Sequence, residues 1–115
     1  MMRPTLSRLL ASVGTEELER FCAETLGDLA RHDLRTGGTL IDTLEVYAAC
    51  GSATETARHL RTHRNTVRYR ISRAQALLGA DLDDPDARLR VAAALRGHRL
   101  LAVRRAAEFV QTIQR

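Results

Sequence analysis

Six arginines lie close together in the middle of the chain, and no acidic residue separates them. Between Glu55 and Asp81 they are Arg58, Arg61, Arg64, Arg68, Arg70 and Arg73. A guanidinium group is a planar fork that pairs with phosphate and can bond O6 and N7 of guanine together. An arginine-rich helix can also be no more than a solvated surface, but this density without acidic neighbours favours a surface for nucleic acid.

Two short helices joined by a tight turn are expected to carry these arginines. Ser52 and Glu55 stand three residues apart, a capping box that predicts the start of a helix at about residue 53. The apolar spacing breaks at residues 61–63, which predicts the turn. A second helix is expected over residues 63–78, with Gly79 just past its end. Its apolar face consists of residues four, three and four apart: Val67, Ile71, Ala74 and Leu78.

This apolar face must pack on Ala57 and Leu60 of the first helix. At about 100° per residue, the side opposite the core carries Asn65, Tyr69 and Ser72, flanked by Arg68 and Arg73. Two helices arranged in this way are typical of a helix-turn-helix, whose second helix enters the major groove of duplex DNA.

The expected DNA contacts follow from the chemistry of the side chains. Arg64 and Thr66 stand in the first turn of the second helix, where a recognition helix usually meets base edges. The hydroxyls of Thr66 and Tyr69 suit phosphate oxygens, as do the free backbone N–H groups at Ser52–Thr54. Two alternatives stay open: His63 could serve the turn, and Tyr69 could pack on a neighbouring surface. The predicted DNA-binding residues are His63, Arg64, Asn65, Thr66, Arg68, Tyr69, Arg70, Arg73, Ser52 and Thr54.

One stretch of the motif resembles a known family. His63–Ile71, with the sequence HRNTVRYRI, is similar to the signature of the carboxy-terminal helix-turn-helix domain of PucR-type regulators, which include purine-catabolism and sugar-diacid (CdaR-type) transcription factors. LIDTLEVY at Leu40–Tyr47 resembles the helix before that domain's motif, and DLDDPDARL at Asp81–Leu89 the segment after it. More loosely, the R-x-T-x-R core resembles Fis-type DNA-binding units. Thr62 departs from the family, which commonly has a valine-like residue there.

The resemblance extends over about Leu40 to Leu95 and carries functional implications. It implies sequence-specific binding of duplex DNA by a bacterial transcriptional regulator. We expect this regulator to act as a homodimer, and a two-fold dimer would bind palindromic sites with half-sites about one helical turn apart. His63 and Arg64 would approach bases. Thr66, Arg68, Tyr69 and Arg70 would contact the DNA backbone, and the exposed side of the helix predicts Arg73 as a further phosphate contact. Because the family usually has a large amino-terminal sensory region, we expect any small-molecule effector to bind outside this chain.

Composition and charge predict a small all-α protein with one basic region. The chain has 115 residues, 3% aromatics, two prolines and no alternating β-branched runs, which favours a small helical bundle. Residues 1–51 carry a net charge of −3, residues 52–80 carry +5 and residues 81–115 carry +2, which together give +4. The positive charge is thus concentrated on the predicted motif. We divide the chain into a helical scaffold (1–38), the helix-turn-helix domain (39–97) and an amphipathic helical extension (98–115).

Scaffold helices are expected before the motif. Apolar spacing in residues 1–13 predicts a short helix or an ordered arm. Thr15 is expected to cap a second helix that ends near Gly27 or continues for another turn or two, with Leu34 directed inward and His32 on the surface. Gly37–Gly38 predicts a break.

A third helix is expected from Thr39, as its cap, to about Cys50. Its predicted inner face consists of Leu40, Ile41, Leu44, Tyr47 and Ala48.

The last helix is expected to begin after a short acidic loop, with Asp84 as cap and Pro85 at its first position. Gly97 should weaken it by about 1 kcal/mol relative to alanine. Beyond Gly97, an apolar run is expected to fold back on the core or, as the alternative, to form the seam of a dimer. The run consists of Leu100, Leu101, Val103, Ala107, Phe109, Val110 and Ile113.

The sequence offers no pattern for catalysis, a metal site or a cofactor. Glycine-rich phosphate loops, H-E-x-x-H and paired cysteines are missing, and Cys22 and Cys50 are expected to be buried thiols. Capping and charge balance explain the aspartates of residues 81–86 better than catalysis does. Without a signal peptide or a span-length apolar run, a cytoplasmic protein that does not enter the membrane is expected. The alternative function is a helical interaction or dimerisation module whose basic face docks an acidic partner.

Overall fold

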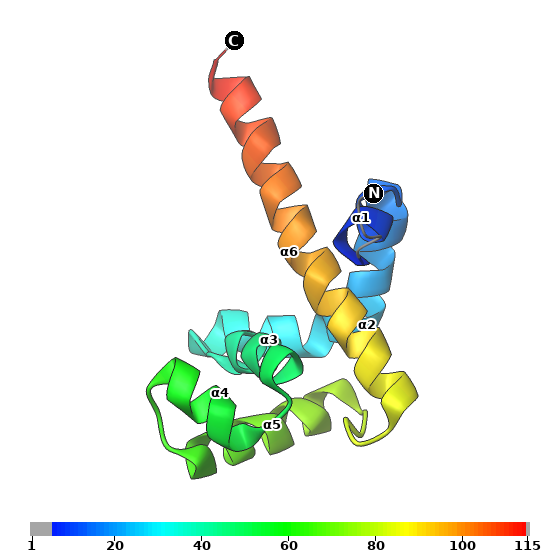
Figure 1. The fold of residues 1–115 in the computed structure, drawn as a ribbon. Coiled ribbons are helices and arrows are strands. Elements are labelled where there is room, and N and C mark those ends of the chain that lie inside the picture. Colours follow the sequence, from blue (N-terminus) through cyan, green and yellow to red (C-terminus); the bar gives the residue numbers. More distant parts are fainter. Residues whose placement is uncertain (1–5, 115) are drawn as a thin grey trace, which may run out of the picture.

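Six α-helices make up the computed structural model, which describes residues 6–114 (Figure 1). In chain order they are α1 (Leu6–Ala11), α2 (Thr15–Thr36), α3 (Leu40–Cys50), α4 (Ala53–Leu60), α5 (Arg64–Leu78) and α6 (Pro85–Ile113). The described residues contain no strand, so the prediction of an all-α bundle with a helix-turn-helix is confirmed. The short helix predicted in residues 1–13 appears as α1, and residues 1–5 lie outside the described part of the chain.

The long helices α2 and α6 cross at Gly97, where they come close together. Gly97 is buried, and a Cβ atom added there would lie 2.9 Å from Cδ1 of Leu18 and 3.0 Å from Sγ of Cys22. Helix α6 continues through Gly97 to Ile113 without a break. The glycine that was expected only to weaken the helix therefore also gives the crossing helix the space it needs.

Helix α2 differs from its prediction in three details. It continues through Gly27 to Thr36, and its N-cap is Gly14, because Thr15 is already its first residue. Leu34 was expected inside but is 85% exposed. His32 was expected on the surface, but its side chain is only 18% exposed, and its Nδ1 is buried without a hydrogen-bond partner.

Helix α3 is capped by a residue from the preceding helix. The carboxylate of Asp33 accepts hydrogen bonds from the backbone N–H groups of Leu40 (3.2 Å) and Ile41 (3.0 Å). Thr39 occupies the predicted cap position, but its side chain makes no cap hydrogen bond. The end of α2 thus fixes the start of the helix that leads into the motif.

The main hydrophobic core joins α2, α3, α5 and α6. Its buried members are Leu26, Leu29, Leu40, Leu44, Ala74, Leu82, Val91, Ala94 and Leu95. The apolar face of α5 was expected to pack on α4, and the two helices do pack on each other. Ile71, Ala74 and Leu78 contribute to this larger core as well, which the prediction did not include. On the inner face of α3, Ala48 is exposed, contrary to prediction, and Thr43 is buried in its place.

Helix α6 projects beyond the rest of the molecule, as Figure 1 shows. Leu101 is its last buried residue and packs with Leu18 and Cys22 of α2. Past this point the apolar side chains of Val103, Phe109, Val110 and Ile113 are between 50% and 66% exposed. The expectation that the whole terminal run folds back on the core is therefore wrong beyond Leu101.

Candidate nucleic-acid interface

The first helix of the motif, α4, begins where the capping box predicts. Ser52 is its N-cap, and Oγ of Ser52 accepts a hydrogen bond from the backbone N–H of Glu55 at 3.1 Å. The hydroxyl of Thr56, which is fully buried, donates to the backbone carbonyl of Ser52 at 2.7 Å. These two bonds fix the amino end of α4, which is the end proposed to approach a phosphate.

The turn between α4 and α5 depends on a left-handed arginine. Arg61 has φ 54° and ψ 47°, a conformation in which L-residues other than Gly, Asn and Asp are uncommon. Its backbone N–H bonds the carbonyl of Arg58 at 3.3 Å, and that of Thr62 bonds the carbonyl of Ala57 at 3.0 Å. This pair of bonds is a Schellman motif, which usually has glycine at the left-handed position. The backbone therefore makes the predicted sharp turn without Gly or Pro.

The recognition helix α5 begins with a histidine cap. His63 precedes the helix in extended conformation, and its Nδ1 accepts a hydrogen bond from the backbone N–H of Asn65 at 3.0 Å. A ring that accepts at Nδ1 carries its proton at Nε2, so Nε2–H is left as a donor. The turn role of His63 is thus observed, and the ring keeps one exposed donor for a ligand.

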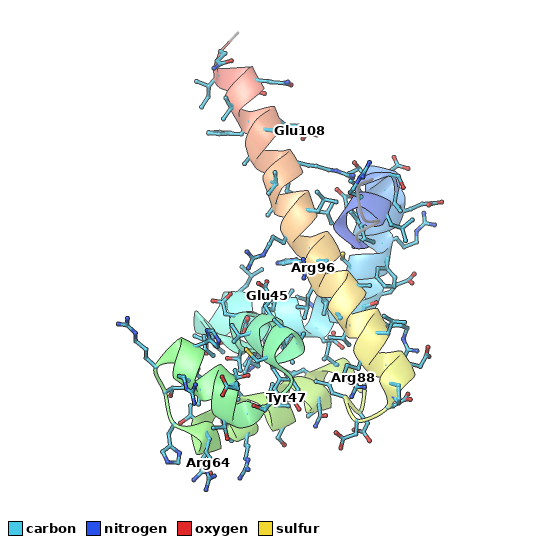
Figure 2. All side chains as sticks on the ribbon, viewed as in Figure 1. Glu45, Tyr47, Arg64, Arg88, Arg96 and Glu108 are labelled. Atoms are coloured by element: carbon cyan, nitrogen blue, oxygen red, sulfur yellow. The ribbon has the colours of Figure 1, made fainter. Side chains whose placement is uncertain are left out.

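The exposed side of α5 agrees with the helical spacing. Its exposed residues include Arg64, Asn65, Arg68, Tyr69, Ser72 and Arg73. Tyr69 is 70% exposed, so it does not pack on a neighbouring surface of this chain. Thr66 and Arg70 are half-buried at the edges of this side, Thr54 on α4 is exposed and Ser52 is half-buried. In Figure 2, Arg64 lies at the end of the molecule opposite the projecting end of α6.

Among the described residues, five of the six arginines have no acidic partner. Arg58 pairs with Glu55 three residues earlier on α4, with Nη2 and Oε1 3.4 Å apart. Within residues 6–114, no carboxylate forms an ion pair with the other five: Arg61, Arg64, Arg68, Arg70 and Arg73. An anion that binds this surface would therefore not displace an internal salt bridge.

The acidic loop after α5 is structural, as the sequence indicates. Asp84 is the N-cap of α6 and accepts from the N–H of Asp86 at 3.4 Å. Asp81 accepts from the N–H of Asp83 at 2.9 Å. The side chain of Gln75 also accepts from the N–H of Leu82 at 2.9 Å, a contact that periodicity does not predict. This loop fixes the carboxy end of α5 relative to α6.

Among the described residues, no three His, Cys, Asp or Glu side chains are grouped so that they could hold a metal ion. Over the same part of the chain, no helix combines the length and apolar character needed to cross a membrane.

Fold and surface together define the helix-turn-helix domain of a transcriptional regulator. The family model of the PucR C-terminal helix-turn-helix domain matches residues 40–97, which is just over half of the chain. The chain belongs to this family, which is a class of transcriptional regulators and not of enzymes.

Three relatives illustrate the similarity. The chain is 40% identical over 100 residues to the purine catabolism regulatory protein of Bacillus subtilis, a match that covers 86% of this chain and 18% of that protein. It is 46% identical over 78 residues to a protein of Thermomonospora curvata, covering 67% of this chain and 43% of the relative. A protein of Mycobacterium bovis is 48% identical over 59 residues, half of this chain and 14% of the relative. The chain thus spans less than half the length of these relatives, and no solved structure matches it.

Proposed function

We propose that this chain binds duplex DNA sequence-specifically, with α5 in the major groove. One observation carries the proposal: five guanidinium groups, none of which has an ion-pair partner among residues 6–114, lie on and around the exposed side of the second helix of a helix-turn-helix. Such a helix matches the width of the major groove, and unpaired arginines match the charge of the phosphates beside it.

The exposed residues divide into base readers and backbone contacts. Arg64, in the first turn of α5, has the donors to bond guanine O6 and N7 together. His63 can donate from Nε2 to a base edge while its Nδ1 keeps the helix cap. The remaining contacts grip phosphates through side chains of Thr66, Arg68, Tyr69, Arg70 and Arg73 and through the amino end of α4 at Ser52 and Thr54.

The protein acts in transcription, and its DNA site lies near genes that it controls. The family and the Bacillus subtilis relative, named for purine catabolism, support regulation of a catabolic operon in the cytoplasm. Any small-molecule effector would bind to a region of the regulator outside these 115 residues.

Binding to the promoter fragment upstream of the protein's own gene tests the proposal. The control is a scrambled duplex of equal length, measured at about 0.15 M salt, where specific and non-specific binding separate clearly. We expect a preference for the promoter that Arg64→Ala removes, at a cost of about 1–3 kcal/mol for the preferred site. Arg90→Ala is the matched control, because Arg90 is exposed on α6 and pairs with Asp86.

Equal binding to the promoter, the scrambled duplex and a polyanion such as heparin would contradict sequence readout. That result would favour the alternative, a basic face that docks an acidic protein.

A further inference from the structure

The projecting end of α6 has an apolar side that nothing in the described chain covers. We call the following residues the tip stripe: Ala102, Val103, Ala106, Phe109, Val110 and Ile113. All six are exposed. At 3.6 residues per turn they fall on one side of the helix, and Ala106 and Ile113 stand seven residues apart, which is nearly two whole turns. A side of this kind on a soluble helix indicates contact with another helix.

The tip stripe is not an extension of the side that packs on α2. Arg104 lies on the α2 side, where it donates to the carbonyls of Ala11 (3.0 Å) and Val13 (3.3 Å). Arg105 approaches Glu19 of α2 at 4.0 Å. The neighbouring helices thus hold α6 through polar contacts on one side, and the apolar residues lie on the other.

Toward its amino end, the same side of α6 forms one wall of a groove. Counting back by sevens from Ile113 leads through Ala106 and Arg99 to Ala92, and Leu95 continues the stripe in the same way from Phe109. Ala92, Leu95 and Arg99 of this set face α3 across a groove of about 340 Å³. The groove is lined by Glu45, Ala48, Ala49, Ala92, Leu95, Arg96 and Arg99. Its apolar lining consists of small side chains and Leu95, whereas the tip stripe ends in large ones.

We propose that two copies of this chain pair through this side of α6, antiparallel, with each tip in the groove of the other. A shift of the two helices that places Ile113 of one copy against Leu95 of its partner also places Phe109 against Arg99. The middle of the pair then brings Ala102 and Ala106 together, and their small side chains permit a close approach. The large side chains at the tip of each copy enter the groove of the other, so the same contact occurs twice. This is the self-complementarity that a two-fold interface requires.

Charge supports the same arrangement. The last carbonyls of α6 have no partner within the helix and carry partial negative charge. In the antiparallel pair they lie beside Arg96 and Arg99 of the other copy's groove. Arg99 already pairs with Glu45, whereas Arg96 has no ion-pair partner among residues 6–114.

A parallel pair is disfavoured because α3 stands beside the lower half of this side of α6. In parallel order, both copies would bring α3 to the same level of the seam. In antiparallel order, only the bare tip of one copy enters the groove of the other.

The pairing has a consequence for DNA binding. Arg64 lies at the end of the molecule farthest from the tip of α6 (Figure 2), so the two recognition helices fall at opposite ends of the pair. This interface therefore joins two separate DNA segments instead of aligning two halves of one palindrome. It also means that loss of pairing leaves the binding of each chain to its own DNA segment intact.

The mass of the 115-residue chain in solution, measured by light scattering without DNA over a range of concentrations, tests the pairing. We expect a dimer that Phe109→Glu converts to a monomer, with at least about 100-fold weaker association because Phe109 enters the interface twice. Gln111→Glu makes a similar change in charge on the opposite side of the tip and should remain dimeric. Helical circular dichroism checks that both variants stay folded.

A wild-type chain that stays monomeric up to its solubility limit would overturn the proposal, as would a Phe109→Glu variant that dimerises normally. Because this test contains no DNA, its result is independent of the DNA-binding proposal.

Disulfide trapping tests the helix orientation in a Cys50→Ser background. A mixture of Ile113→Cys and Arg96→Cys chains should form a mixed disulfide dimer. Ile113→Cys alone should not cross-link, because antiparallel order separates the two positions by about 27 Å at 1.5 Å per residue. Self-cross-linking of Ile113→Cys would overturn the antiparallel arrangement.

Discussion

The salt dependence of DNA binding should distinguish arginines that pair with a carboxylate from arginines that do not. The number of arginines without such a partner gives the expected slope of affinity against salt concentration. Of the arginines proposed to grip phosphates, Arg68, Arg70 and Arg73 have no carboxylate partner among residues 6–114. Neutralising three phosphates gives a slope of log K against log salt of about −2.7, or about a 40-fold loss of affinity between 50 and 200 mM salt. Arg73→Ala should reduce the slope to about −1.8, which is about a 12-fold loss over the same range.

Arg58→Ala supplies the matched control, because Glu55 already balances the charge of Arg58 at 3.4 Å. It should leave the slope close to that of the wild type. Fluorescence anisotropy with a labelled duplex at four or more salt concentrations measures all three slopes. An unchanged slope for Arg73→Ala, or equal flattening by Arg58→Ala, would refute the assignment of phosphate contacts to the unpaired arginines of α5.

The remaining predictions concern stability and thiol chemistry. Gly97→Ala should lower the free energy of unfolding by about 1 kcal/mol in urea, because crowding against Leu18 outweighs the gain in helix propensity; a stabilised variant would contradict this. Arg61→Gly should raise the free energy of unfolding by about 1 kcal/mol, since glycine adopts the left-handed conformation without strain, whereas Arg61→Ala should not raise it. Burial raises the pKa of the Cys22 thiol, so the folded state holds that proton more tightly and stability should fall as pH rises above the ordinary thiol pKa. In native protein, a thiol reagent should modify Cys50 before Cys22.

The motif was predictable because its signals are local. Ser52 and Glu55 are three residues apart, which predicts the start of α4. The apolar spacing from Val67 to Leu78 has the helical period and predicts α5. Gly79 and Asp84 mark helix ends through backbone geometry that only neighbouring residues determine. For these elements, sequence and structure agree within one residue.

The packing of the helices was not predictable in the same way. Periodicity shows that Ile71 and Ala74 face inward, but it does not show that they join a core shared with α2, α3 and α6. Likewise, Ala48 continues the apolar side of α3, yet the direction of α6 leaves it in an open groove. The apolar run after Gly97 has the pattern of a buried helix. Only the length of α6 beyond α2 shows that no other part of the described chain covers its end.

The cap of α3 shows how a contact between helices can replace a local signal, and it gives a test. Thr39 stands at the N-cap position, but the acceptor of the Leu40 and Ile41 N–H groups is the carboxylate of Asp33, on the last turns of α2. Asp33→Ala should therefore lower the free energy of unfolding by about 1–3 kcal/mol, since it removes a charged acceptor of two backbone bonds.

Thr39→Ala should change stability by less than about 0.5 kcal/mol, because its side chain makes no cap bond. Urea denaturation of both variants measures the difference. Equal losses would show that α3 is capped locally. A loss confined to Asp33→Ala would show that the scaffold helix α2 holds the start of the helix that leads into the DNA-binding motif.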